Sequence, residues 1–204
     1  MNSDEYFTIN GIQQAEIKIK GSKFIGTVSP AASEALAKST ILEISKKYFD
    51  ATHNCFAYQV GLAQPIISRS SDDGEPAGTA GLPILNVIKG RNLTNLAVVV
   101  TRYYGGTKLG KGGLIRAYSE CARLALDKCT IVKKYIFQTI DLTFDYNLTG
   151  PVMRIVSQFE AKVVDSQYGD QTFLKLSLRK SKVDDFQDNI VEISSGRVSI
   201  VRSE

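Results

Sequence analysis

The sequence predicts an α+β protein built from two modules, and three observations support this prediction. First, the chain has 204 residues, which allows one domain or two small ones. Second, 43% of the residues are hydrophobic and 23% are charged, a globular composition that excludes wholesale disorder, collagen and a coiled-coil rod. Third, strand and helix periodicities alternate along the chain, and a basic middle gives way to a mildly acidic tail. We therefore expect abutting modules at 1–134 and 135–204.

Hydrophobic periodicity predicts the elements of the first module in order. These are strands over 14–20 and 24–28 separated by Gly21-Ser22, a helix from Ser29-Pro30 through 47, strands over 55–61 and 66–68, a helix over 82–89 ending at a C′ glycine, Gly90, a strand over 96–102, and a helix over 114–129. The strand over 96–102 is continuously apolar, so we expect it at the centre of its sheet. Residues 105–113 are expected to form a glycine-rich loop before the last helix.

The tail repeats a compact pattern of alternating and helical segments. Its expected elements are a strand over 136–144, a helix over 148–159 with Pro151 in its first turn, strands over 161–168 and 172–178 joined by a Gly169-Asp170 turn, a helix over 183–193, and a strand over 197–201. The order is βαββαβ, which predicts a ferredoxin-like domain with both helices on one face of a four-stranded sheet.

Composition also argues against several classes of site. Three cysteines, Cys55, Cys121 and Cys129, make no disulfide framework and are expected to be packed thiols. With one His and no C-x-x-C pair, we expect no zinc site, and no cofactor is indicated. No apolar run approaches the roughly 20 residues that span a bilayer, and the first ten residues lack the features of a signal peptide. We therefore expect a soluble, cytoplasmic protein without membrane contact.

Basic residues concentrate in the middle of the chain. Between residues 89 and 134 ten Lys or Arg residues face only two acidic ones, a net charge of +8, whereas residues 135–204 carry −2. Such an asymmetry indicates a surface that faces a polyanion, with an ordinary solvated surface as the alternative.

The strongest local signal is a strand that runs into a basic, glycine-rich segment and then a helix. Glycines let backbone N–H groups converge, and a helix N-terminus favours an anion. The residues predicted to contact phosphate or nucleic acid are Arg102, Tyr103, Tyr104, Gly105, Gly106, Lys108, Gly110, Lys111 and Arg116. The spacing of Gly105, Gly110 and Lys111 matches most of a P-loop, but Gly112 stands where a hydroxyl should hold Mg²⁺, so nucleoside-triphosphate hydrolysis is not favoured. The two tyrosines would either stack on bases or anchor the loop.

An acidic loop precedes this segment. Asp72, Asp73 and Glu75 lie beside Gly74 and Pro76 in a turn-rich stretch. The carboxylates would bind Mg²⁺ or act as a general base, or else form turns or contact a partner. Upstream, His53 and Cys55 would share one strand face, but nothing nearby in sequence supplies the third group that a nucleophilic dyad needs.

Several spaced blocks resemble the IMPACT family, the YigZ-type group of uncharacterised proteins. The blocks are Gly21-Ser22-Lys23-Phe24-Ile25, residues 51–58 (ATHNCFAY), residues 71–81 (SDDGEPAGTAG), Gly90, and residues 98–110 (VVVTRYYGGTKLG). The resemblance covers roughly residues 10–130, and the tail is similar to the small domain appended to bacterial members.

The resemblance implies a fold and a general role. The first module would be an α/β sandwich like the second domain of ribosomal protein S5, a topology shared with a domain of elongation factor G, and the tail would resemble that factor's final domain. Eukaryotic relatives are implied to regulate translation initiation by competing with a stress-activated kinase for its ribosome-associated activator. They carry a different N-terminal partner domain, so kinase regulation is not transferred to this chain.

Our leading hypothesis is a cytosolic, non-enzymatic regulator that associates with the ribosome or RNA through the basic glycine-rich face. One alternative is an enzyme acting on a phosphorylated or peptide-like small molecule, with His53, Asp72, Glu75 and Arg102 around one pocket. Another is a protein-interaction module that docks a partner through the loop at 72–81, in which Asp72, Asp73, Gly74, Glu75 and Pro76 make the contacts.

Overall fold

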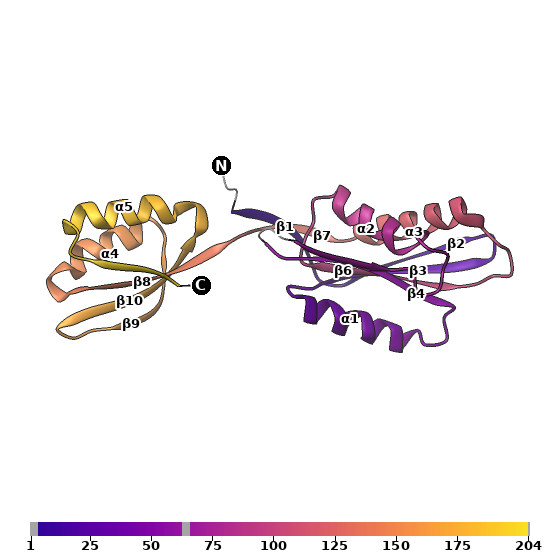
Figure 1. Cartoon of the computed structure of the whole chain (residues 1–204), viewed down its shortest axis with the longest axis horizontal. Helices are drawn as coiled ribbons and strands as arrows, with labels where there is room; N and C mark the ends of the chain where they lie inside the picture. Colours follow the sequence, from indigo (N-terminus) through magenta and orange to yellow (C-terminus); the bar gives the residue numbers. More distant parts are fainter. Residues whose placement is uncertain (1–3, 63–65, 204) are drawn as a thin grey trace. The chain divides into compact units, whose positions relative to one another are not determined.

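The computed structural model describes residues 4–62 and 66–203 (Figure 1). The chain divides into two compact units, and each is described by itself. The larger spans Tyr6–Lys134, and the smaller combines Tyr135–Glu204 with the residues that precede Tyr6. The sequence-based boundary at 134 therefore differs from this division in the assignment of Asp4 and Glu5, which group with the tail.

The larger unit is built on a five-stranded antiparallel sheet with the order β2-β3-β6-β4-β5. These strands are β2 (Gln13–Ile19), β3 (Ser22–Pro30), β6 (Leu96–Tyr103), β4 (His53–Val60) and β5 (Ile67–Ser71). Strand β6 lies at the centre and is buried from Leu96 through Arg102, as its apolar run predicts. The unpredicted strands β1 (Glu5–Asn10) and β7 (Thr130–Tyr135) form a separate two-stranded sheet.

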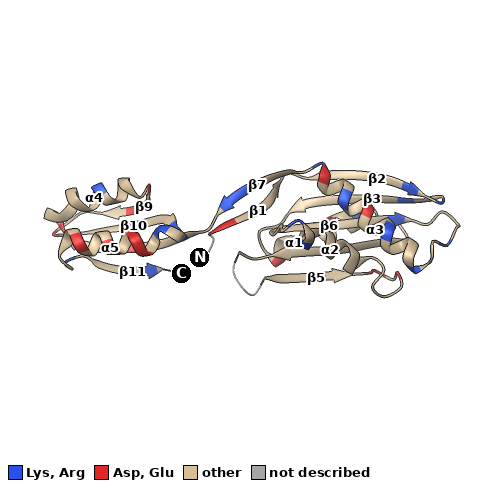
Figure 2. Cartoon of the chain, turned by 90° about the horizontal axis from the view of Figure 1, so that it is seen from above, with Lys and Arg blue, Asp and Glu red and all other residues tan. Residues whose placement is uncertain are grey.

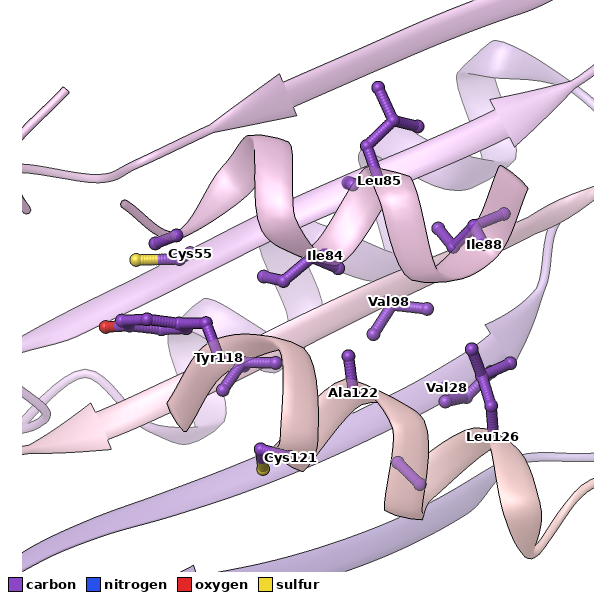
Figure 3. Close-up of a cluster of buried hydrophobic side chains, with 14 of the residues drawn as sticks. Val28, Cys55, Ile84, Leu85, Ile88, Val98, Tyr118, Cys121, Ala122 and Leu126 are labelled. Atoms are coloured by element: carbon purple, nitrogen blue, oxygen red, sulfur yellow. The ribbon is translucent and has the colours of Figure 1, made fainter. Parts of the chain in front are cut away.

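Helices cover both faces of the larger sheet. Helix α1 (Glu34–Lys47) lies on one face, and α2 (Gly81–Gly90) and α3 (Gly110–Asp127) lie on the other (Figure 1). Val98 and Val100 of β6 pack in the α2–α3 core, whereas Ala97 and Val99 pack on the α1 side. Figure 3 shows the α2–α3 core, where labelled side chains from both helices meet those of the sheet. This layout confirms the α/β sandwich that the resemblance implies.

Predicted boundaries of α1 (Glu34–Lys47), α2 (Gly81–Gly90) and α3 (Gly110–Asp127) are wrong. Helix α1 begins at Glu34 rather than near Pro30, because β3 continues through Pro30 and Ser33 caps the helix by accepting the Leu36 N–H at 3.2 Å. Gly90 is the last residue of α2, and the left-handed conformation falls on Asn92 instead (φ 53°). Helix α3 begins at Gly110, so half of the expected glycine-rich loop is the first turn of a helix.

The smaller unit is ferredoxin-like, as predicted. Its elements are β8 (Phe137–Asp145), the 3₁₀ turn η1 (Tyr146–Leu148), α4 (Thr149–Gln158), β9 (Lys162–Gln167), β10 (Gln171–Arg179), the 3₁₀ turn η2 (Lys180–Lys182), α5 (Val183–Ser194) and β11 (Ser199–Ser203). The sheet order is β11-β8-β10-β9 with every neighbouring pair antiparallel. Inward residues of β8 and β10 pack with α4 and α5 in one core, which explains the alternating pattern of the tail.

The start of the chain completes this smaller unit. The Asp4 carboxylate accepts hydrogen bonds from Arg179 Nη2 (2.8 Å) and Nε (3.1 Å) and from the hydroxyl and amide of Ser181 (2.8 and 3.2 Å). The Arg179 bond holds the pKa of Asp4 far below its ordinary value, although burial opposes this. Across the described residues, no helix combines the length and apolarity needed to traverse a bilayer.

Candidate functional site

The acidic loop between β5 and α2 is organised by Asp72. Its Oδ1 accepts the amides of Ala80 (2.9 Å) and Gly81 (2.8 Å), and its Oδ2 accepts that of Gly78 (2.8 Å). Burial disfavours ionisation, but these amides outweigh burial and lower the pKa of the Asp72 carboxyl. The N-cap residue of α2 is Ala80, whose methyl side chain cannot accept a hydrogen bond. Asp72 therefore caps the helix in its place. Both oxygens of the Asp72 carboxylate therefore accept hydrogen bonds from the protein's own backbone.

The same loop is fastened to the start of β4. Asp73 Oδ2 accepts the Asn54 amide at 2.5 Å, and the Asp73 carbonyl lies 2.6 Å from His53 Nδ1. A carbonyl oxygen only accepts hydrogen bonds, so His53 Nδ1 is the donor in this contact. Cys55 Sγ donates to the Asp72 carbonyl at 2.9 Å, and burial raises the pKa of the Cys55 thiol to about 12. Cys55 is thus a packed, neutral thiol and not a nucleophile.

A buried polar cluster lies under the loop. Glu75 Oε1 accepts Arg102 Nη1 at 2.6 Å and the Tyr118 hydroxyl at 2.8 Å, and His53 Nε2 lies 3.9 Å away. The Arg102 and Glu75 side chains are only 6% and 4% exposed. Burial, then Cys55 and Glu75, raise the pKa of Tyr118, which remains a hydrogen-bond donor. Arg102 was predicted to contact phosphate or nucleic acid; in the structure it is buried and its charge is neutralised by Glu75.

Arg102 makes a second anchor through Ser22. Its Nη2 donates to Ser22 Oγ at 3.2 Å, and the Gly105 amide donates to the same oxygen at 3.2 Å. A Cβ on Gly105 would come within 1.9 Å of the Gly21 carbonyl carbon, so the two backbones touch here and only glycine fits. The Gly105 amide, predicted to contact phosphate, is therefore used internally. In contrast, Gly106 (φ 84°) is exposed, and a Cβ added to it would meet nothing within 4 Å.

The exposed cations of this region surround the N-terminus of α3. Lys108, Lys111 and Arg116 are exposed and have no ion-pair partner among the described residues. The α3 N-terminus has no side-chain cap and no acidic residue in its first turn, so its free amides add to the positive potential. We call Lys108, Lys111 and Arg116 the α3 basic face.

Other basic residues of the same segment are neutralised. Arg123 pairs with Glu120 and Asp127, and Arg91 pairs with Asp127. Figure 2 shows this mixture as blue and red segments on α3. Arg91, Arg102 and Arg123 are thus neutralised by carboxylates, whereas Lys108, Lys111 and Arg116 stay exposed near the start of α3.

The two tyrosines at the end of β6, Tyr103 and Tyr104, have different surroundings. The Tyr103 hydroxyl donates to Asp50 Oδ1 at 2.8 Å and so anchors the loop. The Tyr104 amide donates to Thr52 Oγ1 at 3.0 Å, while the Tyr104 side chain lines a cavity of about 470 Å³ and the residue is 45% exposed. The same cavity is lined by Glu75, Arg102, Lys108, Gly110 and Lys111.

Ser22 and Tyr118 are the members of this site that sequence reasoning missed. Ser22 stood only as a turn residue, and Tyr118 lay unremarked among the apolar positions of a helix. The signal that could have found Tyr118 is a hydroxyl on a buried helix face, which needs a polar partner. In the part of the chain that the structure describes, no group of three His, Cys, Asp or Glu residues is placed to hold a metal ion.

Comparison with known proteins matches both units. The family described as Impact N-terminal domain matches residues 20–126, and a domain of unknown function (DUF1949) matches residues 142–197. The IMPACT family member YvyE of Bacillus subtilis is 34% identical over 199 residues, which are 98% of this chain and 91% of the relative. The IMPACT family member YigZ of Escherichia coli is 31% identical over 188 residues, 92% of each protein. A crystal structure described as that of a hypothetical protein is similar with a TM-score of 0.71 and 29% identity, covering 98% of both chains.

This chain matches the YvyE relative and the solved structure over nearly its full length. The match to the Impact N-terminal domain contains every residue of the buried cluster and of the α3 basic face. The chain therefore belongs to the IMPACT family.

Proposed function

We propose that this protein is a non-enzymatic, translation-related regulator that binds RNA, free or within the ribosome, through the α3 basic face. The observation that carries the proposal is the placement of Lys108 and Lys111 at an uncapped helix N-terminus without a neutralising carboxylate among the described residues. A translation-related role is what the resemblance to the IMPACT family implies.

The electrostatics of this helix end favour an anionic ligand. The N-terminus of a helix carries a partial positive charge, so cationic side chains there are unfavourable unless an anion binds. Backbone amides and lysines together suit a phosphate, which accepts several hydrogen bonds at once. Glycines at 110, 112 and 113 leave Lys111 as the side chain beside the amides of the first turn of α3.

The arrangement supports the two alternatives less well. For an enzyme, Glu75 and His53 do approach each other, but Asp72 is committed to the α2 amides and Cys55 is a neutral buried thiol. For a docking loop, the Asp72 and Asp73 carboxylates already accept hydrogen bonds inside the protein. Both carboxylates are therefore used for structure.

The test compares K108E/K111E with a matched double variant on α1, K46E/K47E, which lies on the opposite face of the sheet (Figure 1). Fluorescence anisotropy with a labelled single-stranded RNA at several salt concentrations measures affinity and its salt slope, and co-sedimentation measures ribosome binding. We expect K108E/K111E to weaken binding by about tenfold or more and to reduce the salt slope by about 1.5, because two phosphate contacts are lost.

The control variant should bind like the wild type. Circular dichroism and thermal unfolding verify that both variants fold. Equal affinity and equal salt slope for K108E/K111E and the wild type would refute the assignment of this face, and undetectable RNA and ribosome binding by the wild type would refute the function.

A further inference from the structure

The cavity beside the α3 basic face has a lining with three different chemistries. Its volume of about 470 Å³ lies within the range of small-molecule sites. One part is cationic, with Lys108 and Lys111 at the α3 N-terminus, and Leu109 and Leu114 add apolar surface. Tyr104 contributes an aromatic ring. A nucleotide combines an anionic phosphate with a flat aromatic base. The cationic part of the lining suits the phosphate, and the aromatic ring suits the base.

Arg102 gives independent support for a ligand. Its side chain lines the cavity and is 6% exposed, and Nη1 and Nη2 are held by Glu75 and Ser22. Its Nε is buried and has no hydrogen-bond partner in the described structure. Buried donors are rarely left unsatisfied in native proteins, because the lost hydrogen bond destabilises the fold. Arg102 therefore has an unsatisfied buried donor within a side chain that borders this cavity.

Two contacts with the protein position Tyr104. Its backbone is fixed by the Thr52 hydroxyl, and the Arg102 guanidinium lies 5.3 Å from the centre of its ring. With the residue 45% exposed, the ring has surface available to a ligand. An exposed aromatic ring beside cations is the usual platform on which an unpaired base stacks.

We propose that this cavity binds one unpaired nucleotide of an RNA strand. The inference rests on the proposed RNA-binding function and specifies its ligand. The phosphate contacts Lys108, Lys111 and the free amides at the start of α3, and the base stacks on Tyr104. A duplex cannot use this site, because its bases are already stacked on one another.

The experiment compares three ligands and two variants of one residue. The ligands are a single-stranded 12-nucleotide RNA, its fully paired duplex, and uridine or adenosine monophosphate as a free competitor. The variants are Y104A, which removes the ring, and Y104F, which keeps it. Because Tyr104 is partly exposed and its hydroxyl makes no hydrogen bond among the described residues, Y104F should unfold at the wild-type temperature, and thermal unfolding verifies that Y104A folds.

We expect the wild type to prefer the single strand to the duplex. Y104A should weaken single-strand binding about tenfold or more, while Y104F retains wild-type affinity and duplex binding stays unchanged in both. Free monophosphate should displace the RNA only at concentrations far above the RNA dissociation constant.

Other outcomes separate this inference from the proposed function. If RNA binding depends on Lys108 and Lys111 but Y104A binds the single strand normally, or the duplex binds equally well, the nucleotide site is wrong and the RNA-binding face stands. If a free monophosphate binds as tightly as the RNA, the ligand is a small nucleotide, and the commitment to an RNA strand is overturned. If the wild type binds no RNA at all, both proposals fail.

Discussion

Each unit of this protein contains a buried carboxylate paired with an arginine, and the two pairs are finished differently. In the smaller unit, Asp4 accepts from both Arg179 Nε and Nη2 and from Ser181, and the Arg179 guanidinium lies 3.7 Å from the centre of the Tyr135 ring. In the larger unit, Glu75 binds Arg102 through a single nitrogen, and Arg102 Nε has no partner in the described structure.

The Asp4–Arg179 pair serves the structure of its unit, whereas the Glu75–Arg102 pair borders a cavity. The Asp4 pair joins the start of the chain to the end of β10 and uses both side-chain donors of Arg179 that face it. The Glu75 pair lines a cavity that also contains exposed lysines and Tyr104. A buried ion pair with an unused donor beside a cavity therefore indicates ligand binding more strongly than a buried ion pair alone.

The largest expected effect comes from removing Glu75. Glu75→Ala leaves the Arg102 charge buried without a partner, and we expect the free energy of unfolding to fall by about 3–5 kcal/mol. Urea unfolding followed by circular dichroism measures the loss, and hydrogen exchange of β6 and α3 locates it in the larger unit. The double variant E75L/R102M removes both charges and should recover most of the stability. A double variant as unstable as Glu75→Ala would show that the loss comes from packing and not from the stranded charge.

The Asp4 pair should show itself through pH. Because the native state lowers the pKa of Asp4, its stabilisation is complete above the ordinary carboxyl pKa of about 4 and is lost as the pH falls further. We expect Asp4→Asn to lower the free energy of unfolding of the smaller unit by about 2 kcal/mol at pH 7 and to flatten its dependence on pH below 5. Urea titrations between pH 3 and 7 measure this. Asp188→Asn, at an exposed position of α5, is the control and should keep the wild-type dependence; an equal flattening there would disprove the assignment.

The smallest effect tests the cost of the cationic helix end. Lys111→Glu places an acidic residue in the first turn of α3, so we expect the free energy of unfolding to rise by about 0.5 kcal/mol while RNA affinity falls. Lys47→Glu, in the last turn of α1, should destabilise by a similar amount without changing RNA affinity. Thermal unfolding and anisotropy on the same samples give both quantities. If Lys111→Glu destabilises the protein, then Lys111 has a structural role and its charge is not unfavourable at the N-terminus of α3.

Much of the fold followed from local sequence patterns. The βαββαβ order of the tail and the central position of β6 are visible in alternation and in a continuous apolar run, because burial on one face or both leaves that signature. The start of α3 was missed because Gly110, Gly112 and Gly113 have low helix propensity, and the helix is instead held by the packing of Leu114, Ala117 and Tyr118. Strands β1 and β7 were missed because each is short and pairs with a segment more than 100 residues away.

The candidate site was only half predictable. The exposed positions of Lys108, Lys111 and Arg116 agree with the basic stretch that the sequence displays. The burial of Arg102 was not predicted, although strand alternation puts it on the same face of β6 as Val98 and Val100, which is buried under α2 and α3. A charge on that face requires a buried partner, and the partner, Glu75, comes from a loop 27 residues earlier.

By itself, the sequence determined the two modules, most of their elements and the concentration of positive charge in the first, because periodicity, turn residues and composition act over a few neighbouring positions. The tertiary structure alone decided which charges remain available to a ligand. Neutralisation of Arg102 by Glu75, of Arg91 by Asp127, and use of the Gly105 amide by Ser22 all depend on distances in space. Electrostatic and hydrogen-bond energies fall steeply with those distances, so the net charge of a segment does not reveal its active surface.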